Sequence, residues 1–274
     1  MTTYGDVLEV ERLTPRMVRV VLGGAGLEDF TPTAWADQYV NALFVPDGAP
    51  YGVPFDVDEV RRLPVEHRPV GRRYTIRWWD AASRRLAIDF VVHGDLGAAG
   101  RWANHARPGD RLQIVGPSGG YAPDPAADVH LLVGDESALP AIAAALERIP
   151  PGRQALAVLL VDDAAHQLDL ACPGHLDVTW VHRDAAAGDP DQLLHAVEAL
   201  QLPAGRIQVF VHGEAGEVRA LRRHLLGDRG IPKDQTSISP YWRRDKTDEQ
   251  WREVKRDWLA ACELDLTATP NPSQ

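Results

Sequence analysis

The first half of the chain contains short runs of alternating apolar and polar residues that are typical of β-strands. These runs are rich in Val, Ile, Leu and aromatic residues and are separated by turns that contain Gly, Pro or Asp. They lie at residues 7–12, 16–23, 38–45, 72–80, 86–93 and 111–117. One helical segment, near residues 97–106, interrupts them. Six strands before any regular alternation of strand and helix predict an antiparallel β-barrel.

From residue 128 the pattern changes to continuous apolar runs that alternate with segments of helical period. We expect strands at DVHLLVG, ALAVLLV, DVTWVHR, RIQVFVHG and TSISPYW, and helices at 136–149, 190–201, 214–227 and 248–262. Asp135 or Ser137 is the expected N-cap of the first helix. This alternation predicts an α/β domain with a mainly parallel sheet that is covered on both faces.

The two patterns meet in residues 116–128, a stretch rich in Gly and Pro that suits a linker. We therefore predict two domains, an N-terminal barrel at residues 1–120 and a C-terminal α/β domain at residues 121–274. Residues 116–120 also fit the G-x-S-x-G spacing of hydrolase nucleophiles, but the Pro and Asp residues that follow cannot open the helix that such a nucleophile requires. We interpret this segment as a turn, and the tail after about residue 265 as loose.

The charge pattern limits the possible partners. A formal net charge of −10 argues against a protein that binds nucleic acid by neutralising phosphates. Residues 61–85 nevertheless carry eight arginines against only Glu66 and Asp80. This basic stripe is either a solvated surface or a docking surface for an anionic partner.

Cysteine content and the absence of targeting patterns restrict the remaining classes. The two cysteines, Cys172 and Cys262, are far apart in sequence. We therefore expect no disulfide framework, no iron–sulfur cluster and no structural zinc site. The N-terminus lacks a signal-peptide pattern, and no segment approaches eighteen apolar residues. We expect a cytoplasmic monomer without stable membrane association.

The barrel contains residues suited to a flavin nucleotide. Residues 72–77, RRYTIR, offer a guanidinium for the pyrophosphate, an aromatic face for the flavin ring and a hydroxyl for its edge. In a strand, Arg72 and Tyr74 point to the same side. Residues 89–103 then indicate a strand, a glycine turn and a helix start, where backbone N–H groups can approach a phosphate.

These segments together resemble the siderophore-interacting proteins, the ferric-siderophore reductase branch of the ferredoxin reductase superfamily. The matching segments occur in family order and are RRYTIR at 72–77, DFVVHGDLGAAGRWA at 89–103, GDESALPAI at 134–142, WVHR at 180–183, GEAGEVRALRRHL at 213–225 and YWRR at 241–244. The resemblance implies FAD as the cofactor, NADPH or NADH as the electron donor, and release of iron from a ferric siderophore as the function.

The resemblance also implies where the cofactors bind. The residues that would hold FAD are Arg72, Arg73, Tyr74, Thr75, Asp89, Phe90, Val91, Val92, His93, Ala99 and Gly100. In the second domain, Asp135 and Ser137 follow a strand at the usual place for a nucleotide, and they serve there as nucleotide contacts, as helix caps or as both. The chemistry needs no side chain as a nucleophile or metal ligand.

The identity of the donor and the acceptor stays open at the level of sequence. Asp162 and Asp163 would disfavour a 2′-phosphate, whereas His182 and Arg183 would favour one. The candidates for docking an anionic ferric siderophore are Arg243, Arg244 and Lys246, with the basic stripe as the alternative. Two other functions remain possible: a general flavin or ferredoxin-type reductase, and a carrier that binds the siderophore without reducing it.

Overall fold

The computed structural model describes residues 2–94, 97–183, 189 and 191–267, and it divides the chain into two compact units. The first unit is Met1–Ala122 and the second is Pro123–Gln274. The boundary predicted after residue 120 lies two residues before this division. Within the described ranges, none of the helices has the length and apolar character needed to cross a bilayer.

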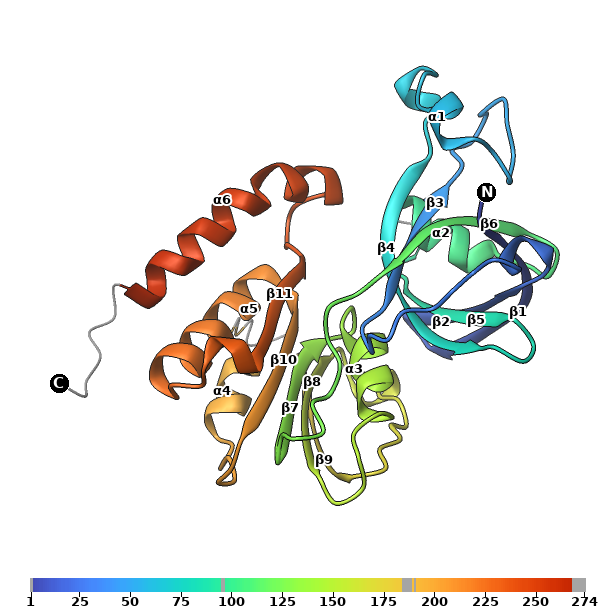
Figure 1. Cartoon of the computed structure of the whole chain (residues 1–274). Coiled ribbons are helices and arrows are strands. Elements are labelled where there is room, and N and C mark those ends of the chain that lie inside the picture. Colours follow the sequence, from blue (N-terminus) through green and yellow to red (C-terminus); the bar gives the residue numbers. More distant parts are fainter. Residues whose placement is uncertain (1, 95–96, 184–188, 190, 268–274) are drawn as a thin grey trace. The chain divides into compact units, whose positions relative to one another are not determined.

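The first unit is a closed barrel of six antiparallel strands, which confirms the predicted barrel (Figure 1). Around the barrel the strand order is β1-β2-β5-β4-β3-β6, and the last strand pairs with the first. The strands are β1 (Tyr4–Thr14), β2 (Met17–Gly23), β3 (Tyr39–Phe44), β4 (Val70–Asp80), β5 (Arg85–Val91) and β6 (Arg111–Ser118).

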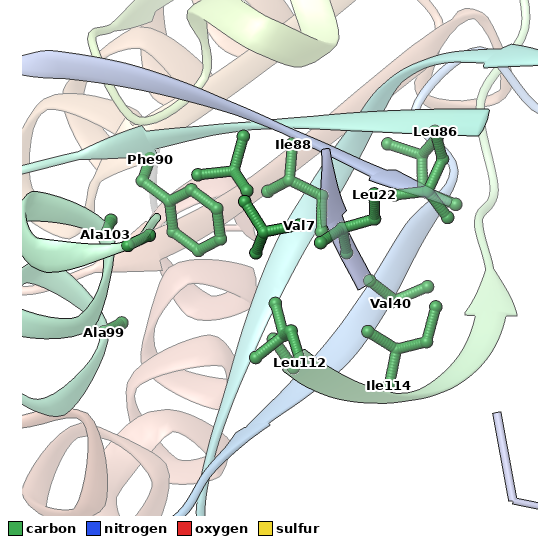
Figure 2. Packing of buried hydrophobic residues seen from close by; sticks show 14 of the residues in the cluster. Val7, Leu22, Val40, Leu86, Ile88, Phe90, Ala99, Ala103, Leu112 and Ile114 are labelled. Atoms are coloured by element: carbon green, nitrogen blue, oxygen red, sulfur yellow. The ribbon is translucent and has the colours of Figure 1, made fainter. Parts of the chain in front are cut away.

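The barrel encloses one apolar core (Figure 2). Leu86, Ile88 and Phe90 alternate along β5, so all three side chains face inward, and each is fully buried. Helix α2 (Gly97–His105) adds Ala99 and Ala103 to the same cluster. These small side chains let the helix lie close to the strands.

An insertion between β3 and β4 was not predicted from the sequence. It contains the single-turn helix α1 (Val57–Val60), whose N-cap Asp56 accepts hydrogen bonds from two backbone N–H groups, and the 3-10 turn η2 (Val65–His67). The buried Gln113 side chain on β6 bonds both the N–H and the carbonyl of Phe55, each at 2.9 Å. This pair of bonds fixes the insertion to the barrel. A further 3-10 turn, η1 (Ala25–Leu27), follows β2.

The second unit is built on a five-stranded parallel sheet in the order β11-β10-β7-β8-β9. Its strands are β7 (Val129–Asp135), β8 (Gln154–Val161), β9 (His175–His182), β10 (Ile207–Glu214) and β11 (Thr236–Trp242). β7 and β8 are buried almost along their whole length, as expected for strands that are covered on both faces. The predicted fold class is thereby confirmed for both units.

Helices cover both faces of this sheet (Figure 1). Helix α3 (Leu139–Leu146) lies on one face, while α4 (Gln192–Glu198) and α5 (Ala215–Arg222) pack their apolar residues against the other. Helix α6 (Asp248–Thr267) packs Trp251, Trp258 and Cys262 against the start of α5. The shorter turns are η3 (Ala164–His166), the π-helical η4 (Arg223–Asp228) and η5 (Lys233–Gln235).

Several boundaries differ from the sequence prediction. The N-cap of α3 is Ala138, not Asp135 or Ser137, because residues 135–138 form a turn in which Ala138 N–H bonds the Asp135 carbonyl at 3.0 Å. The predicted linker begins later than expected, since residues 116–118 belong to β6. Helix α6 extends five residues beyond its predicted end. Asp95 and Leu96 of the predicted glycine turn, and residues 268–274 of the tail, lie outside the described residues.

Candidate functional site

On the barrel, β4 divides the four RRYT residues between its two sides. Arg72 and Tyr74 pair with Ala42 and Val40 of β3, and therefore lie on the side of those core residues. Arg73 and Thr75 lie on the opposite side. The structure thus brings Arg72 and Tyr74 together, as predicted from strand alternation, and separates Arg73 and Thr75 from them.

The residues on that opposite side have their own surroundings. The exposed Arg73 places its guanidinium over the Tyr39 ring, 5.7 Å from the ring centroid. Thr75 is buried and pairs with Tyr39 across the strands. Neither residue shares the side that carries the Tyr74 ring.

An aromatic cluster fixes the position of the half-buried Tyr74 ring. Phe90 lies behind it at a centroid distance of 4.4 Å, and Phe90 in turn contacts Trp102 of α2 at 5.7 Å. Phe44 closes the cluster from β3, 6.5 Å from Tyr74. Phe44 was missed by sequence reasoning, because nothing in its local segment distinguishes it from an ordinary strand residue.

The residues predicted on β5 and just after it have two different environments. Asp89 is buried and forms two 2.7 Å hydrogen bonds with Arg19 of β2, so its carboxylate stabilises the barrel wall. Phe90 and Val92 are buried in the core. Val91 is half-buried and His93 is exposed, which leaves these two accessible to a ligand. Sequence reasoning could not identify Arg19 as the partner of Asp89, because 70 positions separate them.

The chain enters α2 at the same end of the barrel that carries Arg72. β4 and β5 are antiparallel with Ile76 opposite Ile88, so residues before Ile76 lie toward the end of β5. There, Gly94 and Gly97 have φ values of 61° and 72°, and a Cβ at either position would meet no atom within 4 Å. The backbone at Gly94 and at Gly97 is therefore open to a ligand.

These features fit FAD. A guanidinium and an open helix N-terminus suit a pyrophosphate, and the supported Tyr74 ring offers a flat apolar surface for the isoalloxazine. Ala99 and Gly100, predicted as phosphate contacts, are buried in the first turn of α2. Because their side chains are small or absent, they would permit a phosphate to approach the backbone closely.

In the second unit, the five parallel strands end at one edge of the sheet, the place where nucleotides bind in open α/β sheets. Acidic residues dominate this carboxyl edge. The residues at or directly after the strand ends include Asp135, Glu136, Asp162, His182, Arg183, Glu214, Trp242 and Arg243.

Asp135 connects three strands at this edge. Its carboxylate accepts hydrogen bonds from Ser137 N (2.8 Å) and Oγ (2.5 Å), from Trp242 Nε1 (2.7 Å) and from Glu214 N (2.9 Å). Burial raises the pKa of Asp135, against the lowering effect of the Ser137 hydrogen bond. The predicted nucleotide contacts Asp135 and Ser137 are therefore hydrogen-bonded to each other. Asp135 also holds the ends of neighbouring strands together at the carboxyl edge.

Arg183 is held by two carboxylates. It donates from Nη1 and Nη2 to the two oxygens of Glu136, the second bond at 2.7 Å, and from Nη1 to Asp162 Oδ1 at 2.9 Å. Burial lowers the pKa of Arg183, but the hydrogen bonds and charges of these carboxylates outweigh burial and raise it. Sequence reasoning identified Arg183 and Asp162 but not Glu136, which lies 47 positions away from Arg183.

A second acidic pair begins α5. Glu214 caps the helix by accepting from Gly216 N (2.5 Å) and Glu217 N (3.2 Å), and its other oxygen accepts from Arg244 N at 3.0 Å. Glu217 is buried, and burial together with the Asp135 and Glu214 carboxylates raises its pKa to about 8. Glu217 is therefore largely protonated at neutral pH.

The predicted siderophore-docking residues lie in one loop but face different neighbours. Arg244 approaches Glu217 at 3.7 Å with a side chain that is 56% exposed. Arg243 lies over the Trp251 ring at 6.0 Å, and Lys246 is exposed. Arg244 is thus the member of the three that reaches the carboxyl edge. Across the described residues, no group of three His, Cys, Asp or Glu side chains is arranged to hold a metal ion.

Both units match known family models. Residues 6–121 match the siderophore-interacting FAD-binding domain, and residues 127–245 match the siderophore-interacting protein model.

Individual relatives match along almost the whole chain. Ferric vibriobactin reductase of Vibrio cholerae is 35% identical, with 90% of this chain and 96% of the relative covered. The NADPH-dependent ferric-chelate reductase of Escherichia coli is 33% identical, with 86% and 91% covered. A siderophore utilization protein from T. fusca, solved by crystallography, is 37% identical and superposes with a TM-score of 0.76 over 90% of this chain and 95% of that one.

Proposed function

We propose that this chain, which belongs to the siderophore-interacting protein family, is an FAD-dependent oxidoreductase that uses NADH or NADPH to reduce ferric siderophores. The predicted family is confirmed by the models that match both units and by the relatives. FAD as the cofactor agrees with the model matched by the barrel, and the oxidoreductase class agrees with the names of the relatives.

One observation carries the proposal at the level of residues. β4 places Arg72 and Tyr74 on the same side, at the end of the barrel where the open glycine backbone enters α2. A ligand with a flat ring at one end and a phosphate group further along would meet both kinds of partner there. FAD is such a ligand.

Each of these residues has a distinct role in this proposal. Tyr74 would support the flavin ring, Phe90 would hold Tyr74 in place, and Arg72 would neutralise phosphate charge. When bound, FAD supplies the exchange between a two-electron donor and a one-electron acceptor. Tyr74 and the buried cluster behind it would exclude water from one face of the flavin ring.

The acceptor is proposed to be a ferric siderophore, and its iron is the substrate. Reduced iron binds hard oxygen ligands less strongly than ferric iron, so reduction would favour release of the metal from its chelator. Arg243, Arg244 and Lys246 would attract an anionic siderophore by charge. The proposed setting is the cytoplasm, where nicotinamide nucleotides are available, with the protein acting as a monomer.

Purification followed by one steady-state assay tests the proposal. The protein should carry flavin absorption, or acquire it with added FAD, and should oxidise NADH or NADPH faster when a ferric siderophore is present. A colourless protein that binds the siderophore without nucleotide oxidation would instead be a carrier. Equal rates with free flavin and no response to ferric chelates would indicate a general flavin reductase.

A further inference from the structure

The carboxyl edge of the parallel sheet offers a defined place for the adenosine ribose of a nicotinamide nucleotide. In doubly wound sheets, an acidic residue after the second strand bonds the ribose 2′-hydroxyl of NAD, whereas a nearby Arg accommodates the 2′-phosphate of NADP. β7 and β8 are the first two strands of this unit, and they are adjacent and parallel. Asp162 directly follows β8, and Arg183 directly follows the neighbouring β9.

Arg183, the cation best placed for a 2′-phosphate, is already bound by two acids. Both nitrogens at the end of its guanidinium donate to Glu136, which is only 8% exposed, and one of them also donates to Asp162. One positive charge thus faces two negative charges. The cluster of Arg183, Glu136 and Asp162 is therefore anionic as a whole.

The other basic side chains described at this corner already have polar partners. Gln167 Nε2 lies 2.9 Å from His182 Nε2, within hydrogen-bond distance. His166 Nδ1 lies 2.8 Å from Asp163 Oδ1, so a proton on His166 would be paired with that carboxylate. Asp163 adds a further carboxylate that is 64% exposed.

We infer that Glu136 and Asp162 withhold Arg183 from a 2′-phosphate, so that the donor of this chain is NADH in preference to NADPH. The inference rests on the proposed function, because it assigns the donor of that same reaction. It separates this chain from the relative that is named as NADPH-dependent.

The physical reason is a difference in charge between the two nucleotides. A phosphate monoester carries about −1.5 to −2 charge at pH 7. A phosphate at Arg183 would lie beside the Glu136 and Asp162 carboxylates, and it would compete with them for the single positive charge of the guanidinium. A 2′-hydroxyl has no such cost, since it can donate a hydrogen bond to a carboxylate oxygen.

Binding of NAD⁺ and NADP⁺ to the FAD-loaded protein, measured by titration calorimetry at low ionic strength, tests the inference. We expect the wild type to bind NAD⁺ at least about tenfold more tightly than NADP⁺. The double variant Glu136→Gln/Asp162→Asn removes both charges that hold Arg183 and should bring the two affinities close together, mainly by improving NADP⁺. Asp162→Asn alone retains the Glu136–Arg183 pair and should change the ratio only in part.

A matched control removes the same charge elsewhere in the unit. Asp177 and Glu198 are exposed carboxylates, and Asp177 lies roughly 16 Å along β9 from His182. Asp177→Asn/Glu198→Gln should leave the NAD⁺ to NADP⁺ ratio unchanged. Thermal unfolding without nucleotide verifies that each variant is folded.

The outcomes distinguish this inference from the proposed function. Tighter binding of NADP⁺ by the wild type, or an unchanged ratio in the folded Glu136→Gln/Asp162→Asn variant, would overturn the inference. A higher kcat/KM for reduction of a ferric siderophore with NADPH than with NADH would also overturn the inference, but it would leave the proposed function intact. Failure of both nucleotides to bind and to reduce the flavin would remove the proposed function, and the inference with it.

Discussion

At the scale of single residues, the side of the strand on which a side chain lies decides its role. Arg72 and Arg73 are adjacent in sequence, but they lie on opposite sides of β4. Arg72 shares its side with Tyr74, whereas Arg73 lies over Tyr39. The two arginines can therefore be tested against each other with the same substitution.

Arg72→Ala is expected to lower FAD affinity about 10- to 100-fold, the effect of losing a charge-assisted hydrogen bond. Salt screens a pyrophosphate contact, so the variant should also show a weaker dependence of FAD affinity on ionic strength. Titration of FAD into the apo variant at two salt concentrations measures both effects. Arg73→Ala is the matched comparison and should change neither. An unchanged salt dependence in Arg72→Ala would remove Arg72 from the site.

Tyr74→Ala should lower FAD affinity about tenfold through loss of the aromatic surface. Tyr74→Phe retains the ring and should keep most of the affinity, which separates the ring contact from any hydroxyl contact. Flavin fluorescence titration gives both values. Wild-type FAD retention by Tyr74→Ala would show that the isoalloxazine does not lie beside this residue.

The sequence predicts which residues share a side but not which polar residues bind each other. Strand alternation placed Arg72 with Tyr74 correctly, because β4 pairs with β3 without a register shift over these residues. Arg19 and Asp89 lie on strands far apart in sequence, and Glu136 and Arg183 directly follow two other such strands. Such pairs depend on the order of strands in a sheet, which no local pattern contains.

At the scale of elements, the carboxyl edge of the parallel sheet collects acids at the ends of its strands. Burial raises the pKa of Asp135, and burial together with the Asp135 and Glu214 carboxylates raises the pKa of Glu217. The helix α5 begins inside this group. Its stability should therefore depend on pH.

Glu217 should make the protein less stable as the pH rises. Its pKa of about 8 lies above the ordinary value of an unfolded Glu, so the folded state holds a proton that the unfolded state releases. The corresponding stabilisation is fully present below the unfolded pKa and is lost as the pH rises through the folded pKa. Glu217→Gln should be more stable than the wild type at pH 9, by on the order of a few kcal/mol, and should show a flatter profile between pH 5 and 9.

Denaturant unfolding at pH 5, 7 and 9 measures this difference. Because Asp135 also contributes to the pH dependence, the quantity of interest is the difference between wild type and variant rather than either profile alone. Parallel profiles for the two proteins would mean that Glu217 is ionised in the folded state.

The loop after β11 gives a prediction about the acceptor. Replacing Arg243, Arg244 and Lys246 by neutral residues should raise the KM for an anionic ferric siderophore and leave flavin reduction by the nucleotide nearly intact, because these cations act on encounter. An uncharged ferric hydroxamate is the control substrate and should be unaffected. A slower first half-reaction in stopped-flow, or an unchanged KM at low salt, would direct attention to the basic stripe at residues 61–85.

The elements themselves were largely predictable, and the exceptions have local causes. Strand periodicity and apolar runs placed the eleven strands in the described part of the chain to within a few residues. Helix α1 was missed because four residues carry no periodic signal. The start of α3 was misplaced because Asp135 bonds the turn before the helix, where an N-cap would otherwise lie.

At the scale of the whole molecule, the proposed function assigns a different ligand to each of the two units. The barrel offers the surface with Arg72 and Tyr74, and the parallel sheet offers the carboxyl edge. Amide hydrogen exchange should therefore show FAD protecting residues 70–80 and 97–105 most strongly. NAD⁺ should protect the ends of β7 and β8. Protection of the same segments by both ligands would contradict this division.

Phe90 belongs both to the packed interior of the barrel and to the support of the Tyr74 ring. A substitution that alters the interior at this point also shifts the surface on which a flavin would rest, so natural or laboratory selection cannot adjust one property alone. Variants selected for heat resistance through Phe90 would carry altered cofactor retention as a by-product. Those selected for a different flavin would inherit a changed tolerance to heat.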